Sequence, residues 1–587
     1  MRKQKVSALV ALLLAGTMLF TACGSNKAEE KQSTGTDKVQ EESSVKEDSA
    51  ESSEEVATEN YDPFGKYEEG VTLTVAKELR SGLKFNTADE KTKSLEENIW
   101  AAAYEEELGI TLDYIWTAAS DAYTSKWNAS LATGDIPDIA IVGSGLYQQL
   151  KEAGLCMDMT DYFENYASDA YKAAVEADGG VAKGYITEGG RMYGLPHVGS
   201  QPDDVSLLYI RQDWLEELNL PVPTTLEELY ETAKAFVENN MGGENTIGLA
   251  LGKSLTYGYC EATGIFNGFG AYPGIWVEQE DGSLGYGTIQ PEMKEGLLFL
   301  QKMYAEGLLR ADFATLDNGS ASGVDVCNGT AGILYGRYTA PLRMVAASYA
   351  NDPDTRWICL EGISEDGTPI IGQGTAEPTC YIFVSKDCEH PEAVVKMLNL
   401  QLVSQYVEGD YDSIGSGDDR ITTSEYRFAY AFYKPWKNVE LYKLYSSPLE
   451  SGDYSQIYEA FGTGELGESW VDWIEMIKET ILAGNFEDER VSGDLYCTAM
   501  LSYGDESAFG RISNMLDEDR IITSSFRGVY SEFANQNLGN MNEVLWGEYL
   551  KIIMGADIDN FDKAVEVWKQ TGGDQITQEV NDWYALQ

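Results

Sequence analysis

The side chains best suited to chemistry in this sequence are aromatic residues near the ends of predicted strands. The chain contains 12 Trp and 36 Tyr residues, and tyrosine is about twice as frequent as in an ordinary globular protein. Sugar rings stack their apolar faces on aromatic planes, and their hydroxyl groups need oriented donors and acceptors. Packing in the core is the alternative, and it suits most of these residues. Six lie in turn-rich loops and are predicted to line a cleft: Trp116, Tyr147, Tyr257, Trp276, Tyr335 and Tyr338.

Polar residues and one more aromatic residue complete the predicted binding site. Asp135 lies in a Gly-Asp-Ile-Pro turn, which either sets the geometry of the next strand or faces the cleft. Tyr209 and Arg211 follow a predicted passage between two halves of the chain. Arg211 could donate paired hydrogen bonds to ligand hydroxyls or form a salt bridge between the halves. Arg337 follows a strand at its carboxyl end, and Trp436 follows a proline in a loop.

Motifs for the common enzyme classes are absent from the sequence. It has no P-loop, no HExxH, no DxDxDG calcium loop and no GxSxG elbow. The only histidines, His197 and His390, cannot form a His-rich metal site. The 97 acidic residues allow many carboxylate pairs of the glycosidase kind, but no pair stands out. We therefore predict no catalytic residue, metal or cofactor.

The charge of the chain excludes several kinds of partner. With 97 acidic and 42 basic residues, the net charge is −55. A surface this acidic repels nucleic-acid phosphates and anionic bilayers, so attachment to a membrane should be covalent. The hydrophobic fraction of 43% is that of a globular protein, and 587 residues are too many for one compact core.

The amino terminus predicts export and anchoring. Basic residues precede a 15-residue apolar run at 6–20, which suits a secretory signal at residues 1–22. Small residues before Cys23 look like a bacterial lipobox, in which Cys23 is lipidated. Residues 23–67 then form an acidic tether that cannot bury enough apolar surface to fold. The predicted location is the cell membrane, lipid-anchored and facing outward.

The elements that must position the site form two α/β regions. Strands are predicted at 71–76, 110–116 and 138–142, and a capping box at Ser94 and Glu97 predicts the start of the first helix. This order predicts a parallel βαβαβ sheet. The second region has strands near 207–210, 246–251 and 331–335, a doubled capping box at 224–228 and a glycine-rich segment, 264–270, interpreted as a loop. Residues after about 440 are mainly helical. Ligands of such sheets bind beyond the carboxyl ends of strands.

Several segments, in order and spacing, resemble family 1 extracellular solute-binding proteins of bacterial ABC importers, in their long lipoprotein branch associated with oligo- and polysaccharides. They are SLATGDIPDI at 130–139, LLYIRQDWLEE at 207–217, LPVPTTLEE at 220–228, YAEGL at 304–308, GILYGRY at 332–338, HPEA at 390–393 and KIIMGADIDNFDKAVEVW at 551–568.

The resemblance implies an α/β, two-lobed, periplasmic-binding-protein-like (type II) fold with a cleft between the lobes and a helical carboxy-terminal segment. Lobe 1 would comprise residues 68–203 plus about 371–440, and lobe 2 residues 204–370 plus about 441–587. Calcium loops of some alginate-binding relatives have no counterpart here. The implied function is capture of an oligosaccharide by a monomer and its delivery to ABC permease subunits. A surface glycoside hydrolase, or a peptide or other small-solute binder on the same scaffold, are the alternatives.

Overall fold

The structure is a computed structural model. It describes residues 61–586 except for short gaps at 81–82, 89–90, 197–201, 257, 319–320, 376–377, 379, 404–412, 415–420, 423–425, 429–434 and 462. The predicted signal peptide, Cys23 and most of the tether lie outside the described residues, as do Tyr257 and His197. Among the described helices, none is both long and apolar enough to cross a membrane.

The first sheet confirms the predicted parallel βαβαβ order. Strand β1 (Val71–Leu79) pairs in parallel with β2 (Ile110–Ala119) on one side and with β3 (Ile139–Val142) on the other. A distant segment adds the fourth strand, β13 (Tyr381–Val384), antiparallel to β3. All four residues of β3 and of the edge strand β13 are buried, so this side of the sheet is covered on both faces.

Helices from two separate stretches of sequence cover this first sheet. They are α2 (Ile99–Ala103), α3 (Ser120–Thr133), α4 (Ser144–Glu152), α5 (Thr160–Tyr166), α6 (Asp169–Glu176), α7 (Val181–Gly184) and α14 (Pro391–Val403). The predicted helix start at Ser94 was wrong. The Ser94 hydroxyl accepts the amide of Glu97 within a turn, whereas the helix begins at Ile99 because the Asn98 side chain caps the amides of Trp100 and Ala101.

The second sheet is mixed, with strand order β11-β6-β10-β7. β7 (Ile247–Ala250) and β10 (Ala331–Gly336) are parallel, whereas β6 (Leu207–Arg211) runs antiparallel to β10 and to β11 (Trp357–Leu360). Its helices include α8 (Gln212–Glu217), α9 (Leu226–Glu238), α10 (Thr263–Gly268), α11 (Met293–Ala305), α12 (Val324–Cys327) and α13 (Ala346–Asn351).

The glycine-rich segment predicted to be a loop instead contains helix α10. Every residue of α10 is buried, and its glycines permit close packing rather than a flexible turn. A Cβ atom on Gly264 would lie 2.3 Å from ring atoms of Tyr335, and one on Gly296 of α11 would lie 2.5 Å from Phe266. By contrast, the capping prediction for α9 is confirmed, since Thr225 accepts the amide of Glu228 and Glu228 accepts that of Thr224.

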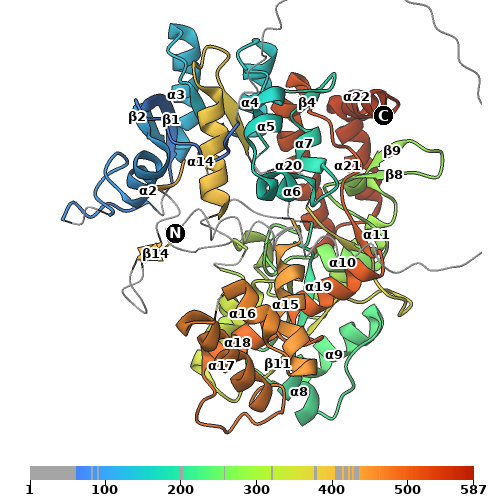
Figure 1. The fold of residues 1–587 in the computed structure, drawn as a ribbon. Coiled ribbons are helices and arrows are strands. Elements are labelled where there is room, and N and C mark those ends of the chain that lie inside the picture. The colour runs from blue at the N-terminus through green and yellow to red at the C-terminus, as the bar shows by residue number, and fades with distance from the viewer. Residues whose placement is uncertain are drawn as a thin grey trace, which may run out of the picture.

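The last third of the chain is helical, as predicted, and packs on the second sheet. Residues 526–580 share one hydrophobic core with residues 208–363, and residues 439–515 join another with residues 205–370. The helices are α15 (Lys437–Ser451), α16 (Ser455–Phe461), α17 (Glu465–Glu479), α18 (Gly493–Ser502), α19 (Ala508–Asp517), α20 (Glu532–Ile553), α21 (Asp559–Trp568) and α22 (Asp574–Tyr584). Helix α20 packs on α11 and also contacts α4, so the last helices lie beside the first body (Figure 1).

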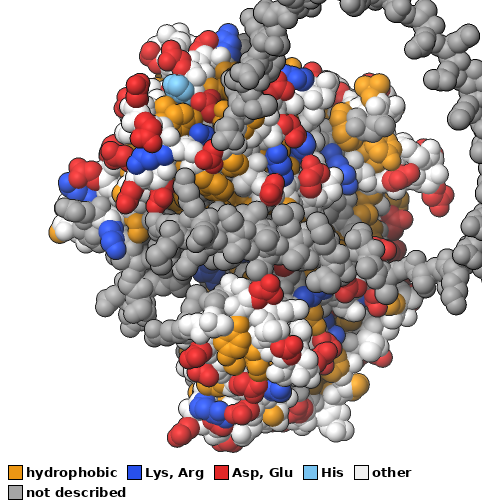
Figure 2. Space-filling model, in the orientation of Figure 1, with side chains coloured by type: hydrophobic (Ala, Val, Ile, Leu, Met, Phe, Trp, Pro, Cys, Tyr) orange, Lys and Arg blue, Asp and Glu red, His pale blue; other side chains and the backbone are white. Residues whose placement is uncertain are grey.

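Two bodies result, and extended segments run between them. Residues 71–195 and 380–428 form the core of the first body, which is separate from the cores around the second sheet. At the passage, β12 (Gly372–Gln373) pairs in parallel with β16 (Ile521–Ile522), and residues 202–206 run alongside, with a Cβ on Gly374 meeting the carbonyl of Pro202. The exact lobe boundaries given above stay a prediction. Acidic side chains are spread over both bodies (Figure 2).

Candidate functional site

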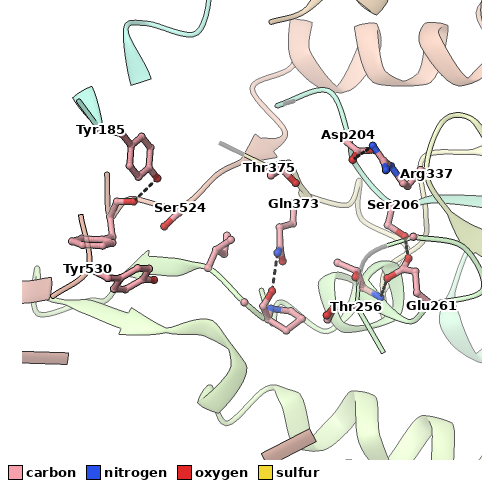
Figure 3. Close-up of a pocket in the computed structure, with 17 residues that line it drawn as sticks. Tyr185, Asp204, Ser206, Thr256, Glu261, Arg337, Gln373, Thr375, Ser524 and Tyr530 are labelled. Carbon is pink, nitrogen blue, oxygen red and sulfur yellow. Dashed lines mark hydrogen bonds and ion pairs between the residues drawn. The ribbon is translucent and has the colours of Figure 1, made fainter. Parts of the chain in front are cut away.

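A cavity of about 230 Å³ lies where the chain passes between the two bodies (Figure 3). The passage segments supply Asp204, Ser206, Gln373 and Thr375. The loop after β7 supplies Thr256 and Glu261, and Thr263 is the first residue of α10. The smallest typical small-molecule sites have a volume of about 300 Å³, so this cavity is slightly smaller. The cavity therefore suits part of an extended ligand better than the whole of one.

An ion pair forms one wall of the cavity. Arg337, directly after β10, donates from Nε to Asp204 Oδ1 at 2.7 Å, and its Nη2 lies 2.7 Å from Oδ2. The Asp204 side chain is 1% exposed and that of Arg337 is 23% exposed. Burial raises the pKa of Asp204, and the guanidinium of Arg337 opposes that effect. The arginine thus keeps a buried carboxylate paired while one edge of the pair faces the cavity.

A second buried carboxylate, Glu261, faces the same cavity. Its residue exposure is 1%, and it accepts hydrogen bonds from the Ser206 hydroxyl and, at 2.6 Å, from the amide of Thr263. Burial raises the pKa of Glu261, the two hydrogen bonds oppose that rise, and the charge of Asp204 adds to it. Because burying a carboxylate costs free energy, Glu261 is better explained by a role in the cavity than by a role in stability.

This arrangement predicts the effect of Glu261→Gln on stability. Because the pKa of Glu261 is higher in the folded protein than in the unfolded chain, the folded protein binds the Glu261 proton more tightly. The contribution of Glu261 to stability therefore falls as the pH rises from the pKa of the unfolded state to that of the folded state. A glutamine keeps an acceptor for Thr263 and carries no charge. We expect Glu261→Gln to melt higher than the wild type at pH 7, with the gap narrowing at acidic pH. A lower melting temperature at pH 7 would contradict this account.

The opposite wall is aromatic and contains a contact between the bodies. The Tyr185 hydroxyl, from the core of the first body, donates to the backbone carbonyl of Phe526 at 3.3 Å. Tyr530 also faces the cavity, and its hydroxyl accepts from the indole of Trp276 at 2.8 Å. Gln373 donates its amide to the carbonyl of Pro273 at 2.7 Å. The cavity therefore offers flat rings on one side and charged or amide groups on the other (Figure 3).

Of the predicted site residues, Arg337 lines this cavity, and two others lie directly behind it. Trp276 is completely buried, but it positions Tyr530 through its indole N–H. Tyr335 is completely buried against Gly264, and the charge of Glu261 contributes, after burial, to raising the pKa of Tyr335. For these two aromatic residues, the structure favours a supporting role over direct lining.

Three residues that were predicted to bind ligand instead pack in the cores. They are buried and their polar groups are already hydrogen-bonded within the protein, so they are not available to a ligand. Tyr147 is completely buried, stacks on Tyr381 at 4.5 Å and donates to the carbonyl of Tyr193. Tyr209 is likewise buried and donates to the carbonyl of Arg337 at 3.2 Å. Arg211 forms its salt bridge with its neighbour Asp213 and stacks on Trp214, so it does not bridge the lobes.

Four other predicted residues lie away from the cavity. Trp116 packs edge-on against Trp127, and exposed Asp135 accepts a hydrogen bond from Thr133 within its own turn. Tyr338 packs on Phe509 and lines a separate hollow on the second body. Trp436 lines a small hollow between Pro202 and Arg527 at the passage. Tyr257 lies outside the described residues, between the lining residues Thr256 and Gly258.

Sequence reasoning missed most of the cavity, including Asp204, Glu261 and Gln373. A usable signal existed for two of them, because Asp204 and Gln373 lie at the passages predicted near 204 and 371. The segments after β7 and β10 supply Glu261 and Arg337 to the cavity, a placement consistent with the expectation that ligands bind beyond strand ends. Among the described residues, the loops directly after β1, β2 and β3 contribute none to the cavity, and the first body contributes Tyr185.

Metal ligation has no support in the part of the chain that the structure describes. Within those residues, no group of three His, Cys, Asp or Glu side chains is close enough to hold an ion. Both cavity carboxylates already have protein partners in Arg337, Ser206 and Thr263. The residues that line the site can form hydrogen bonds with a ligand and stack against it.

Two α/β bodies joined by extended segments, with a polar cavity at the junction, define the class of two-lobed binding proteins. A family model described as "Bacterial extracellular solute-binding protein" matches residues 88–408. The chain belongs to this family. Two relatives come from Bacillus subtilis (strain 168). The polygalacturonan/rhamnogalacturonan-binding protein YtcQ is 23% identical over 482 residues, covering 80% of this chain and 85% of that protein. Lipoprotein LipO is 24% identical over 491 residues, covering 82% and 88%.

Solved structures confirm the predicted fold. An HMO-binding, ABC-transporter-associated solute-binding protein from Bifidobacterium longum infantis superposes with a TM-score of 0.57 at 17% identity, covering 88% of this chain and 98% of that one. The S. pneumoniae ABC-transporter substrate-binding protein FusA, in complex with kestose, gives a TM-score of 0.53 at 13% identity, covering 88% and 100%. At these identities, the likeness establishes the two-lobed α/β architecture.

Proposed function

We propose that this protein captures an oligosaccharide in the cavity between its lobes and delivers it to the permease of an ABC importer without breaking a bond in it. The observation that carries the proposal is the cavity itself, in which Tyr185, Phe526 and Tyr530 face Arg337, Glu261 and Gln373. Rings stack on the sugar faces, and the polar groups match the hydroxyls. The name of YtcQ and the complex of FusA with kestose, which both refer to carbohydrates, support the same class of ligand.

Capture follows from contacts that exist only when the lobes are together. Tyr185 belongs to the first body and reaches the carbonyl of Phe526 in the second across the edge of the cavity. A ligand that fills this cavity contacts both bodies at once and therefore stabilises the closed arrangement over the open one. The closed surface is what a permease would recognise. Lipidation of Cys23 and the acidic tether would hold the protein at the membrane, in keeping with its likeness to a lipoprotein.

Intrinsic fluorescence tests this proposal directly. A sugar stacked on Tyr530 would disturb the hydrogen bond from Trp276, so we expect a saturable change in tryptophan emission when an oligosaccharide binds. Trp276→Phe should lose most of that change. Trp127→Phe, which alters an equally buried indole in the first body, should retain it. If no member of a broad glycan panel changes the emission or releases heat in calorimetry, the proposal is wrong.

A surface glycoside hydrolase is the second candidate, and the two buried carboxylates are the observation that favours it. A glycosidase acid has a raised pKa, as Glu261 does. However, Asp204 makes two contacts with Arg337, and Glu261 accepts from two hydrogen-bond donors. Carboxylates that are already paired in this way favour ligand binding over catalysis. Release of reducing ends from a bound glycan would establish the hydrolase. Affinity for peptides with none for glycans would establish the peptide-binding alternative.

A further inference from the structure

The cavity is lined by more carboxylates than cationic groups, and this imbalance affects which sugars it can bind. Among the described lining residues, three carry charge: Asp204, Glu261 and Arg337. Two carboxylates and one guanidinium leave an excess of one negative charge when all are ionised. Arg527 follows the lining residue Phe526 in the sequence but does not add a positive charge to this cavity. Its side chain is exposed and lines two neighbouring pockets.

The one arginine among the described lining residues is already paired with a carboxylate. Arg337 contacts both oxygens of Asp204 at 2.7 Å, in the paired geometry that it would also use for a sugar carboxylate. A uronate would have to share or displace that pair, and displacement would leave Asp204 charged and unpaired with its side chain 1% exposed. Leaving such a buried charge unpaired is strongly unfavourable.

Glu261 adds a second obstacle to anions and an attraction for hydroxyl groups. Its oxygens accept from Ser206 and Thr263, and an ionised carboxylate has about four acceptor positions, so it can accept more hydrogen bonds. Sugar hydroxyls can donate to it, whereas a uronate carboxylate cannot and is repelled. Asp204 is also within electrostatic reach of Glu261, so the two negative charges act together on this part of the cavity.

We propose that this cavity selects uncharged oligosaccharides and rejects those with a uronate at the cavity, with Glu261 and the Asp204–Arg337 pair as the specificity-determining groups. This inference rests on the proposed function, because it assumes that the ligand is a glycan. It separates this protein from one that holds an acidic polymer of the kind named in the description of YtcQ. The overall charge of −55 acts in the same direction on polyanions.

The test compares matched glycans that differ only in charge. Calorimetry on the full chain would use a panel of neutral oligosaccharides and the same panel after oxidation of C6 to the carboxylate. We expect the oxidised form of the best neutral ligand to bind about 100-fold more weakly or worse, as expected for like charges about 6 Å apart at the effective dielectric of a protein surface. Because the cavity carboxylates are buried, high salt should leave most of the gap between the two affinities in place. Equal or tighter binding of the oxidised form overturns the inference and leaves the proposed function standing.

Variants assign the discrimination to the cavity. Glu261→Gln should weaken the neutral ligand, because an acceptor oxygen is lost, and should weaken the oxidised ligand less, so that the ratio of the two affinities falls by about tenfold. Glu231→Gln removes an exposed charge from the same body and should leave the ratio unchanged. An equal effect of both variants would place the discrimination in the overall charge and contradict the assignment. If neither form of any glycan binds, the proposed function itself fails.

Discussion

Replacing Arg337 with glutamine is expected to have the largest effect on binding, together with a large loss of stability. The change leaves the Asp204 carboxylate, 1% exposed, without its cation, and breaking a buried ion pair from one side typically costs about 3–5 kcal/mol. Because Arg337 is partly exposed, we expect a loss at the lower end, about 3 kcal/mol, in the free energy of unfolding at pH 7. Binding of the preferred glycan should fall below detection in calorimetry.

The stability of the Arg337→Gln variant is also expected to depend on pH. Burial raises the pKa of Asp204, and removing Arg337 removes the group that opposes that rise. The folded variant would then take up a proton more readily than the unfolded chain, so its stability should recover as the pH falls. The double variant Asp204→Asn/Arg337→Gln carries no unpaired charge and should regain most of the lost stability, but not the binding. An Arg337→Gln protein as stable as the wild type at pH 7 would mean that the pair is solvated.

Replacing Trp276 with alanine is expected to cost about 3–5 kcal/mol of stability, the usual range for a buried Trp→Ala change. The indole is completely buried, packs on Tyr286 at 5.1 Å between ring centres and donates to Tyr530. Chemical denaturation followed by circular dichroism would measure the loss in the second body. Glycan affinity should also fall, since Tyr530 loses the donor that positions its ring.

A less buried tryptophan from the same core provides the control. Trp583 is half-buried and packs edge-on against Phe526 at 5.1 Å, so Trp583→Ala should cost clearly less stability. If Trp583→Ala proves the more damaging of the two, the packing described around Trp276 is wrong. If Trp276→Ala lowers stability without any change in affinity at temperatures where the protein is folded, Tyr530 does not contact the ligand.

Most of the fold was predictable from the sequence because its signals are local. Alternating or apolar runs located β1, β2, β3, β6, β7 and β10 to within a few residues. The failures also have local causes. At Ser94, a serine–glutamate spacing typical of a cap occurred in a turn, while Asn98 capped the helix. At 264–270, glycines normally read as loop residues instead allow the Tyr335 ring to contact a buried helix.

The candidate site was less predictable, because it forms from segments that are distant in sequence. Aromatic residues near strand ends were reasonable candidates, but whether a ring lines a cavity or packs in a core depends on tertiary packing. Tyr147 and Tyr209 are buried and hydrogen-bonded to backbone carbonyls. Asp204 and Glu261 are ordinary members of a set of 97 acidic residues until the fold brings them beside Arg337. Arg337 was identified because a strand end is a local feature.

Isothermal titration of the full chain against a neutral glycan panel, followed by chromatography of each recovered sugar, tests the central claim most directly. The account predicts saturable binding of at least one oligosaccharide at one site per chain, with the sugar recovered intact after long incubation and with the signal abolished in Arg337→Gln. Shortened sugar products, or a panel without a single binder while peptides titrate, would contradict it.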